Sequence, residues 1–117
     1  MTEPINYHYT IIRTDLPLGD MLAQTIHAAG ETATPLPPEG THAVCLAADN
    51  EQHLLQIAQR LMRRRVPHKL IREPDSPYHN QAMAIGVYPS QDRKSIKRAL
   101  SRLSLVTERK KDDNYDR

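Results

Sequence analysis

Five polar side chains with possible roles in acid–base or ester chemistry lie close together near the start of the chain. Arg13 and Asp15 end an apolar stretch, and Asp20, Gln24 and His27 follow at positions i, i+4 and i+7. That spacing places the last three on one face of a helix. A carboxylate can act as a base, and an amide can donate hydrogen bonds to a developing oxyanion. The stretch therefore predicts a polar site where a helix begins.

A strand, a tight turn and a helix are expected to position these groups. The apolar run ending at Ile12 predicts a buried strand, and Asp15, Pro17 and Gly19 predict a turn. Asp20 then stands at the expected helix N-cap, and apolar residues recur behind it at helical spacing: Leu22, Ala23, Ile26 and Ala29. Ligands of open α/β sheets bind at the carboxyl ends of strands, so this junction is the predicted site.

The whole chain alternates strand and helix patterns in the order β-α-β-α-β-β-α. Expected strands cover residues 7–13, 42–48, 68–72 and 81–88, with helices near 20–30, 50–66 and 89–103. Strands joined through a helix are expected to run parallel, whereas a short loop predicts an antiparallel pair. The predicted fold is therefore α/β, a four-stranded mixed sheet between helices, in a single domain over residues 1–107. The charged stretch 108–117 predicts a disordered tail.

The second helix has the clearest pattern. Asp49 and Gln52 form a capping box, and a stripe of apolar residues follows: Leu54, Leu55, Ala58, Leu61 and Met62. Four residues from three of the predicted elements are expected in the core, namely Leu55, Leu61, Ile85 and Leu100.

Basic residues are concentrated in two stretches, although the net charge of the chain is only +2. The first holds Arg60, Arg63, Arg64, Arg65, His68, Lys69 and Arg72, and the second holds Arg93, Lys94, Lys97, Arg98 and Arg102. Two interpretations stay open on composition alone, a solvated helix surface or a surface that binds phosphates.

Several function classes lack support in the sequence. The six histidines show no HxxxH or HExxH spacing and Cys45 is the only cysteine, so no metal site is expected. No glycine-rich phosphate loop occurs, and no cofactor is expected. Cys45 is expected to be a small buried residue of a strand. No signal-peptide or membrane-spanning pattern is present, which predicts a cytoplasmic protein.

The opening of the chain resembles that of the type 2 peptidyl-tRNA hydrolases. In that family a strand ends in Val-Arg-x-Asp-Leu, a glycine loop follows, and a helix opens with Ala-Ala-Gln-Cys-x-His-Ala. The matching residues here are Arg13, Asp15, Leu16, Gly19, Ala23, Gln24, His27 and Ala28. The resemblance continues in element order over residues 7–106. It implies a three-layer α/β/α fold with strand order 2-1-4-3 and one antiparallel strand, and it implies hydrolysis of the ester between peptide and tRNA.

Three departures from the family affect the implied site. Asp20 occupies the position of the family's catalytic Lys, Glu73 occupies that of an Asp, and the family's loop threonines have no counterpart. By resemblance the catalytic candidates are Glu73 as base, Gln24 as oxyanion donor, and Asp20. The substrate-binding candidates are Arg13, Asp15, His27, Arg60, Arg63, Arg64, Lys94 and Lys97, with tRNA as partner and a homodimer as possible assembly. The alternative is a weakened or inactive module that binds tRNA or another ligand on the same fold.

Overall fold

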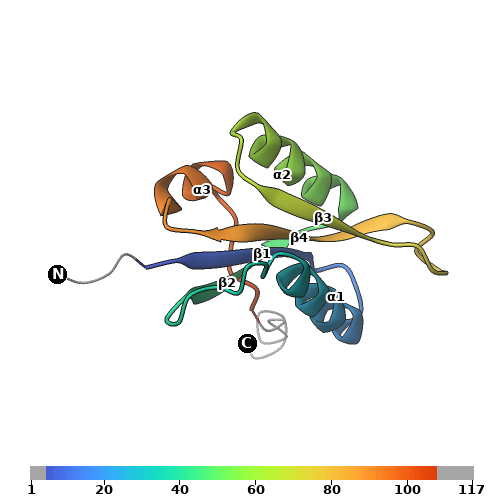
Figure 1. The fold of residues 1–117 in the computed structure, drawn as a ribbon. Coiled ribbons are helices and arrows are strands. Elements are labelled where there is room, and N and C mark those ends of the chain that lie inside the picture. Colours follow the sequence, from blue (N-terminus) through green and yellow to red (C-terminus); the bar gives the residue numbers. More distant parts are fainter. Residues whose placement is uncertain (1–4, 108–117) are drawn as a thin grey trace, which may run out of the picture.

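The computed structural model describes residues 5–107, which form a sheet with helices on both faces (Figure 1). In chain order the elements are β1 (Tyr7–Arg13), α1 (Leu18–Glu31), β2 (His42–Ala48), α2 (Glu51–Arg63), β3 (His68–Glu73), β4 (Gln81–Ser90) and α3 (Arg93–Ala99). The predicted order of elements is confirmed. The predicted tail, residues 108–117, lies outside the described residues.

The sheet has the strand order β2-β1-β4-β3, as the resemblance implied. β1 runs parallel to β2, with Ile11 opposite Leu46, and β4 runs antiparallel to β1 and to β3. β1, β2 and β3 therefore share one direction and end at the same edge of the sheet, where β4 begins. α1 and α2 also begin there, each just after a strand has ended.

Alternation along the central strand divides the core into two layers. Ile11 packs in the cluster that contains α2 and α3, whereas its neighbour Ile12 packs in the cluster with Ala28 of α1. This is the side-chain period of a strand covered on both faces. The three-layer architecture is confirmed. Leu61, Ile85 and Leu100 are buried as predicted, and Leu55 is partly buried.

Helix α1 differs from its prediction in both its start and its buried face. The helix begins at Leu18 after Pro17, so Asp20 lies inside the first turn and is not the N-cap, and no side chain caps this end. Leu22 and Ile26 are 58% and 73% exposed, while Gln24 faces the protein interior. Helical spacing showed that a helix forms here, but it did not identify the buried side.

The helix α1 approaches the sheet closely enough to touch backbone. A Cβ atom added at Gly86 of β4 would lie 2.4 Å from the carbonyl oxygen of Ala28 and 2.7 Å from Thr32 Oγ1. Thr32 ends the helix, is fully buried, and donates a 2.8 Å hydrogen bond to that same carbonyl. The absence of a side chain at residue 86 therefore sets the depth at which α1 packs.

The other two helices have side-chain caps. Asn50, and not the predicted Asp49, caps α2 by accepting a hydrogen bond from the backbone N–H of His53. Asp92 caps α3 through the N–H of Ser95, because β4 continues to Ser90 and the helix starts later than predicted. Met62, expected in the apolar stripe of α2, is exposed, and Ile57 is fully buried instead.

A short extended segment lies along the outer edge of β2. The N–H of Ala47 donates to the carbonyl of Ser104, and the N–H of Val106 donates to the carbonyl of Cys45. Leu46 and Leu105 are bridge partners in antiparallel sense. The segment thus satisfies backbone groups of an edge strand that no other strand covers.

Candidate functional site

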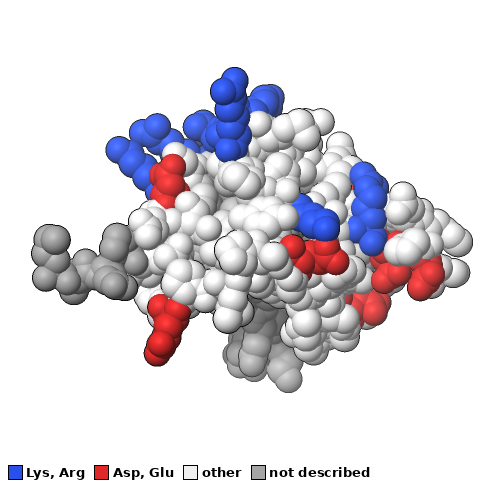
Figure 2. Space-filling model, viewed as in Figure 1, with Lys and Arg blue, Asp and Glu red and all other residues white. Residues whose placement is uncertain are grey.

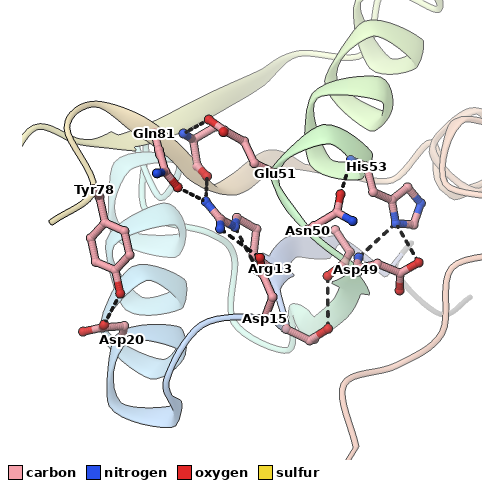
Figure 3. A network of polar contacts seen from close by, with 12 residues as sticks. Arg13, Asp15, Asp20, Asp49, Asn50, Glu51, His53, Tyr78 and Gln81 are labelled. Atoms are coloured by element: carbon pink, nitrogen blue, oxygen red, sulfur yellow. Dashed lines mark hydrogen bonds and ion pairs between the residues drawn. The ribbon is translucent and has the colours of Figure 1, made fainter.

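Five of the predicted site residues lie at the edge of the sheet where β1 and β3 end, and Figure 3 shows three of them, Arg13, Asp15 and Asp20. The strand β1 supplies Arg13, the turn after it supplies Asp15, the helix α1 supplies Asp20 and Gln24, and the end of β3 supplies Glu73. The loop 74–80 between β3 and β4 lies against them. The strand order therefore brings side chains of residues 13–24 together with Glu73, which is 49 positions after Gln24.

Arg13 is a buried guanidinium with mostly internal partners. It makes two hydrogen bonds of 2.9 Å to the carboxylate of Asp15, and its Nη1 donates to the side chain of Gln81 and to the carbonyl of Ala82. The guanidinium thus uses four of its five N–H donors to join the end of β1 to the start of β4. Its hydrogen bonds with Asp15 raise the pKa of Arg13 and hold the pKa of the Asp15 carboxyl below its usual value.

The lowered pKa of Asp15 predicts an acid-sensitive contribution to stability. A carboxyl whose pKa is lower in the folded state stabilises the fold above its unfolded pKa, near 3.8, and loses that contribution as the pH falls further. Replacing Asp15 with Asn should cost about 1 kcal/mol at pH 7, since the carboxylate is partly exposed. The variant should then lose less stability than the wild type between pH 5 and pH 2. Urea denaturation across that range measures both quantities, and parallel curves would contradict the assignment.

Gln24 and Glu73 form the central contact of the site. The Gln24 Nε2 donates a 2.9 Å hydrogen bond to Glu73 Oε1, and the backbone N–H of Asp75 donates to Glu73 Oε2 at 3.2 Å. Gln24 is only 8% exposed, and its Oε1 is buried without a hydrogen-bond partner among the described residues. Two predicted catalytic residues, 49 positions apart, are thus in direct contact.

Asp20 lies one helical turn before Gln24 and binds the loop that covers the site. The Tyr78 hydroxyl donates a hydrogen bond to Asp20 Oδ2, and this hydrogen bond is the main cause that raises the pKa of Tyr78 (Figure 3). Its partnership with Asp20 was not predicted, because no sequence spacing links residues 58 positions apart.

Glu51 is a further member that the sequence did not identify. It occupies the first turn of α2, and its Oε2 accepts a 2.8 Å hydrogen bond from the backbone N–H of Ala82 (Figure 3). It also contributes to the raised pKa of Arg13. An acidic residue in the first turn of a helix that follows a strand could have indicated this place.

His27 is not brought into the central contact. Its Nε2 lies 3.1 Å from Glu31 Oε2, one turn further along α1, and its side chain is half exposed. Glu31 also forms an ion pair with Lys69 of β3. His27 therefore belongs to a surface group with Glu31 and Lys69, between α1 and β3.

The basic residues of α2 and α3 lie at the opposite end of the sheet from Glu73. Figure 2 shows Lys and Arg gathered at upper left, over the end of α2 and over α3. α2 starts at the site edge, and its 13 residues extend about 20 Å from it. We call this surface the basic ridge; its residues are Arg60, Arg63, Arg64, Arg65, Arg93, Lys94, Lys97 and Arg98.

Two hollows open on the surface around this ridge. One of about 210 Å³ lies between the end of α2 and the start of α3, where Arg64, Arg65 and Ser90 line it. The other, of about 260 Å³, lies between α3 and the outer part of β2, where Arg93, Lys97 and Arg102 surround apolar side chains. Neither Gln24 nor Glu73 is among the residues that line these two hollows.

Neither a metal site nor a membrane-spanning helix is found in the part of the chain that the structure describes. Residues 5–107 contain no group of three or more His, Cys, Asp or Glu side chains arranged to hold a metal ion. None of the helices within the same residues is long and apolar enough to cross a bilayer.

The chain is similar to known proteins in both sequence and fold. A family model described as peptidyl-tRNA hydrolase PTH2 matches residues 7–106. Among solved structures, a protein of unknown function from Agrobacterium tumefaciens strain C58 is similar with a TM-score of 0.69 and 16% identity, covering 87% of this chain and 98% of that one. At this identity the likeness concerns the fold. The comparison with curated proteins finds no match.

Proposed function

Because the chain belongs to the peptidyl-tRNA hydrolase PTH2 family, we propose that it hydrolyses the ester that joins a peptide or other acyl group to tRNA. The observation that carries this proposal is the hydrogen bond between Gln24 and Glu73. This hydrogen bond joins a carboxylate to an amide donor at the edge of the sheet where α1 begins. The start of α1 has no side-chain cap. A base and hydrogen-bond donors are what ester hydrolysis by water requires.

In the proposed reaction Glu73 accepts a proton from a water molecule as that water attacks the ester carbonyl carbon. The carbonyl oxygen becomes an oxyanion, to which the Gln24 amide and the free N–H groups of the first turn of α1 donate hydrogen bonds. The C–O bond to the terminal ribose then breaks, and the ribose oxygen receives a proton. The products are a free carboxylic acid and free tRNA. Arg13 and Asp15 hold the strand end in place and flank the substrate.

The second candidate function is a binding module that has lost catalysis. The observation that favours it is Asp20, which stands at the position of the family's Lys and accepts the hydrogen bond from Tyr78. A carboxylate there repels an oxyanion where an ammonium would attract it. Losing one oxyanion donor costs on the order of 100- to 1000-fold in kcat.

Release of free tRNA from purified peptidyl-tRNA separates the two functions. The hydrolase should release tRNA at a rate proportional to protein concentration, and the Glu73→Ala variant should release it no faster than buffer. A binding module should retain tRNA on the protein in both forms with no release above the spontaneous rate.

The tRNA backbone is proposed to bind along the basic ridge. Phosphate contacts dominate the affinity of proteins for nucleic acids, and the ridge carries several cations on neighbouring helices. The ridge lies roughly the length of α2 from Glu73, about 20 Å, so a bound tRNA would contact it with phosphates distant from the ester.

Charge reversal on the ridge should weaken tRNA binding and its dependence on salt. The triple variant Arg60→Glu, Arg63→Glu and Arg64→Glu should lower the magnitude of the slope of log K against log salt by about 1–3, because each lost phosphate contact removes about one released counterion. Fluorescence anisotropy with labelled tRNA measures the slope. Reversal of Lys94, Lys97 and Arg98 tests whether α3 takes part. Thermal melting of each variant serves as the folding control, and unchanged slopes in both would exclude the ridge.

We also propose that the protein acts in the cytoplasm.

We further propose that two copies of the chain form a homodimer through the outer face of α1. Leu18, Leu22 and Ile26 are spaced by four residues and exposed by 68%, 58% and 73%. Gly19 and Ala23 lie beside them, so the face offers both a ridge of large side chains and a groove of small ones. A surface of this kind can pack against a second copy of itself.

Leu22→Asp should therefore convert a dimer to a monomer. An aspartate at the centre of the apolar face would be desolvated at the interface without a cation to pair with. Light scattering after size exclusion measures the mass. Met62→Asp, at an exposed apolar residue of α2, is the matched control and should leave the mass unchanged. A wild-type protein that is monomeric at high concentration would contradict the proposal.

A further inference from the structure

We propose that the hollow between α3 and the outer part of β2 holds an unpaired base of single-stranded RNA, with the neighbouring phosphates on the cations at its rim. The inference rests on the proposed function in one respect, since it takes tRNA as the natural source of that strand. It goes beyond the basic ridge, because phosphate contacts carry no information on the bases. Binding of a single strand can be measured without any hydrolysis.

The hollow combines an apolar floor with a cationic rim. Tyr9 and Leu46 lie at its floor and are only 4% and 8% exposed, whereas the three basic residues that line it are all exposed: Arg93, Lys97 and Arg102. Among the described residues that line the hollow, none is acidic. A ligand that suits it is therefore apolar at its centre and negatively charged beside that centre.

Aromatic rings continue from the hollow toward the start of β1. Tyr7 stacks on Tyr9, with ring centroids 6.3 Å apart, and His42 of β2 meets the Tyr7 ring edge-on at 5.4 Å. The guanidinium of Arg93 lies over the same ring, with its Cζ 4.5 Å from the centroid. Aromatic side chains and cations that alternate on the face of a sheet are typical of proteins that bind single-stranded nucleic acids.

This part of the sheet stays partly open because α3 is short. The helix has seven residues and is about 10 Å long, and it lies at the end of the sheet where β1 begins (Figure 1). The strands β1 and β2 have seven residues each and extend about 23 Å. As a result His42 is exposed, and Tyr7 and Val44 are only partly buried. The aromatic and aliphatic side chains of the hollow are thus accessible to a ligand.

An unpaired nucleotide matches this surface in shape and in charge. Its base has flat apolar faces, and its phosphates lie on either side of the base along the strand. The hollow has a volume of about 260 Å³, just below the roughly 300–1,000 Å³ of pockets that enclose a drug-sized ligand, which suits one ring system. The bases of a duplex are stacked inside it, whereas unpaired bases can be splayed out and read. A fatty acid or an acidic peptide also brings an anion and an apolar group, but neither needs the neighbouring rings for stacking.

Three labelled oligonucleotides of equal length test the inference by fluorescence anisotropy. They are a single-stranded RNA, the same strand without its bases, and the matched RNA duplex. The strand with bases should bind about 5- to 150-fold more tightly than the abasic strand, the usual contribution of one stacked base. The affinity of both strands should fall with salt, but their ratio should persist, because a stacked base is not screened by ions. The duplex should show no such gain over the abasic strand.

A matched pair of serine variants assigns the gain to the hollow. Ser101 lines the hollow and is exposed, so Ser101→Leu adds apolar volume there without changing the charge. It should bring the ratio between the two strands close to one and leave the affinity for the abasic strand unchanged. Ser104→Leu makes the same change at an exposed side chain outside the hollow, and it should keep the wild-type ratio. Thermal melting shows that both variants are folded.

NMR of the methyl groups of Val44 and Leu105 reports on the ligand in the hollow directly. Both residues line it, and the ring current of a bound base should shift their signals in a saturable manner, whereas the abasic strand should not. Dodecanoate and an acidic peptide, added in place of RNA, test the other two ligands. If either binds at these methyl groups more tightly than the RNA strand, the hollow belongs to that ligand and the inference is wrong.

The remaining outcomes separate this inference from the proposed hydrolase. Equal affinity for the strands with and without bases, or equal affinity for the duplex, would overturn the base site even if peptidyl-tRNA is hydrolysed. A preference for the strand with bases that Ser101→Leu abolishes would support the site even if no tRNA is released from peptidyl-tRNA, and only the hydrolase would then be wrong.

Discussion

Replacing Glu73 with glutamine is expected to lower kcat for ester hydrolysis by about 100- to 10,000-fold, the usual contribution of a general base. Glutamine has the shape of glutamate, and its carbonyl oxygen can still accept the hydrogen bond from Gln24. It cannot take a proton from water. The loss should therefore appear in kcat, with little change in KM, because the proposed contacts with the tRNA backbone lie on the basic ridge.

Asp75→Asn is the matched control for this variant. Asp75 touches Glu73 only through its backbone N–H, and that donor is unchanged by the substitution. The control should keep most of its activity and its melting temperature. A Glu73→Gln protein that is folded and hydrolyses the ester at the wild-type rate would show that another group is the base.

Replacing Gly86 with alanine is expected to lower the melting temperature by about 4–24 °C. The added Cβ would lie 2.4 Å from the Ala28 carbonyl oxygen and 2.8 Å from Thr32 Cγ2, and these atoms belong to backbone or to a fully buried side chain. The helix α1 would have to move outward along its whole contact with β4. Overpacking of this kind costs about 1–3 kcal/mol, and each kcal/mol shifts the melting temperature of a domain of this size by about 4–8 °C.

Gly30→Ala makes the same chemical change at a glycine where nothing lies within 4 Å of the added atom. Gly30 is inside α1, where alanine is preferred over glycine by about 0.5–1 kcal/mol. This variant should melt a few degrees above the wild type. Calorimetry of both proteins checks the pair, and similar melting temperatures for the two would show that α1 is not fixed by Gly86.

The strands were predictable because their patterns are local. The run from Tyr7 to Arg13 and the run from His42 to Ala48 are bounded by turn residues, and both predicted ranges agree with the structure. The meeting of Gln24 and Glu73 followed from the strand order that the family resemblance implied. Periodicity alone could not have given that order, since it carries no information on which strands are neighbours.

The orientation of α1 could not be predicted from its residues. Its apolar side chains Leu22 and Ile26 face solvent, whereas Gln24 is buried against Glu73. The side that packs is chosen by the close approach at Gly86 and by a polar contact with a distant strand. Hydrophobic spacing shows which side of a helix could be buried. Here the hydrogen bond between Gln24 and Glu73 and the lack of a side chain at Gly86 determine which side is buried. The hydrogen-bond partners of Arg13 on β4 were not predicted either, because they too are distant from it in the sequence.

The segment that lies along β2 has a consequence for aggregation. An uncovered edge strand offers its N–H and C=O groups to the strands of other molecules, which is a route to fibrils. Here the backbone of residues 104–106 occupies those positions on β2. The opposite edge, β3, is short and carries Lys69 and Arg72, which disfavour pairing with a second copy. A protein shortened before Ser104 would keep every residue of the candidate site but would leave the outer edge of β2 uncovered. Its expected defect is poor solubility, and not the loss of its chemical activity.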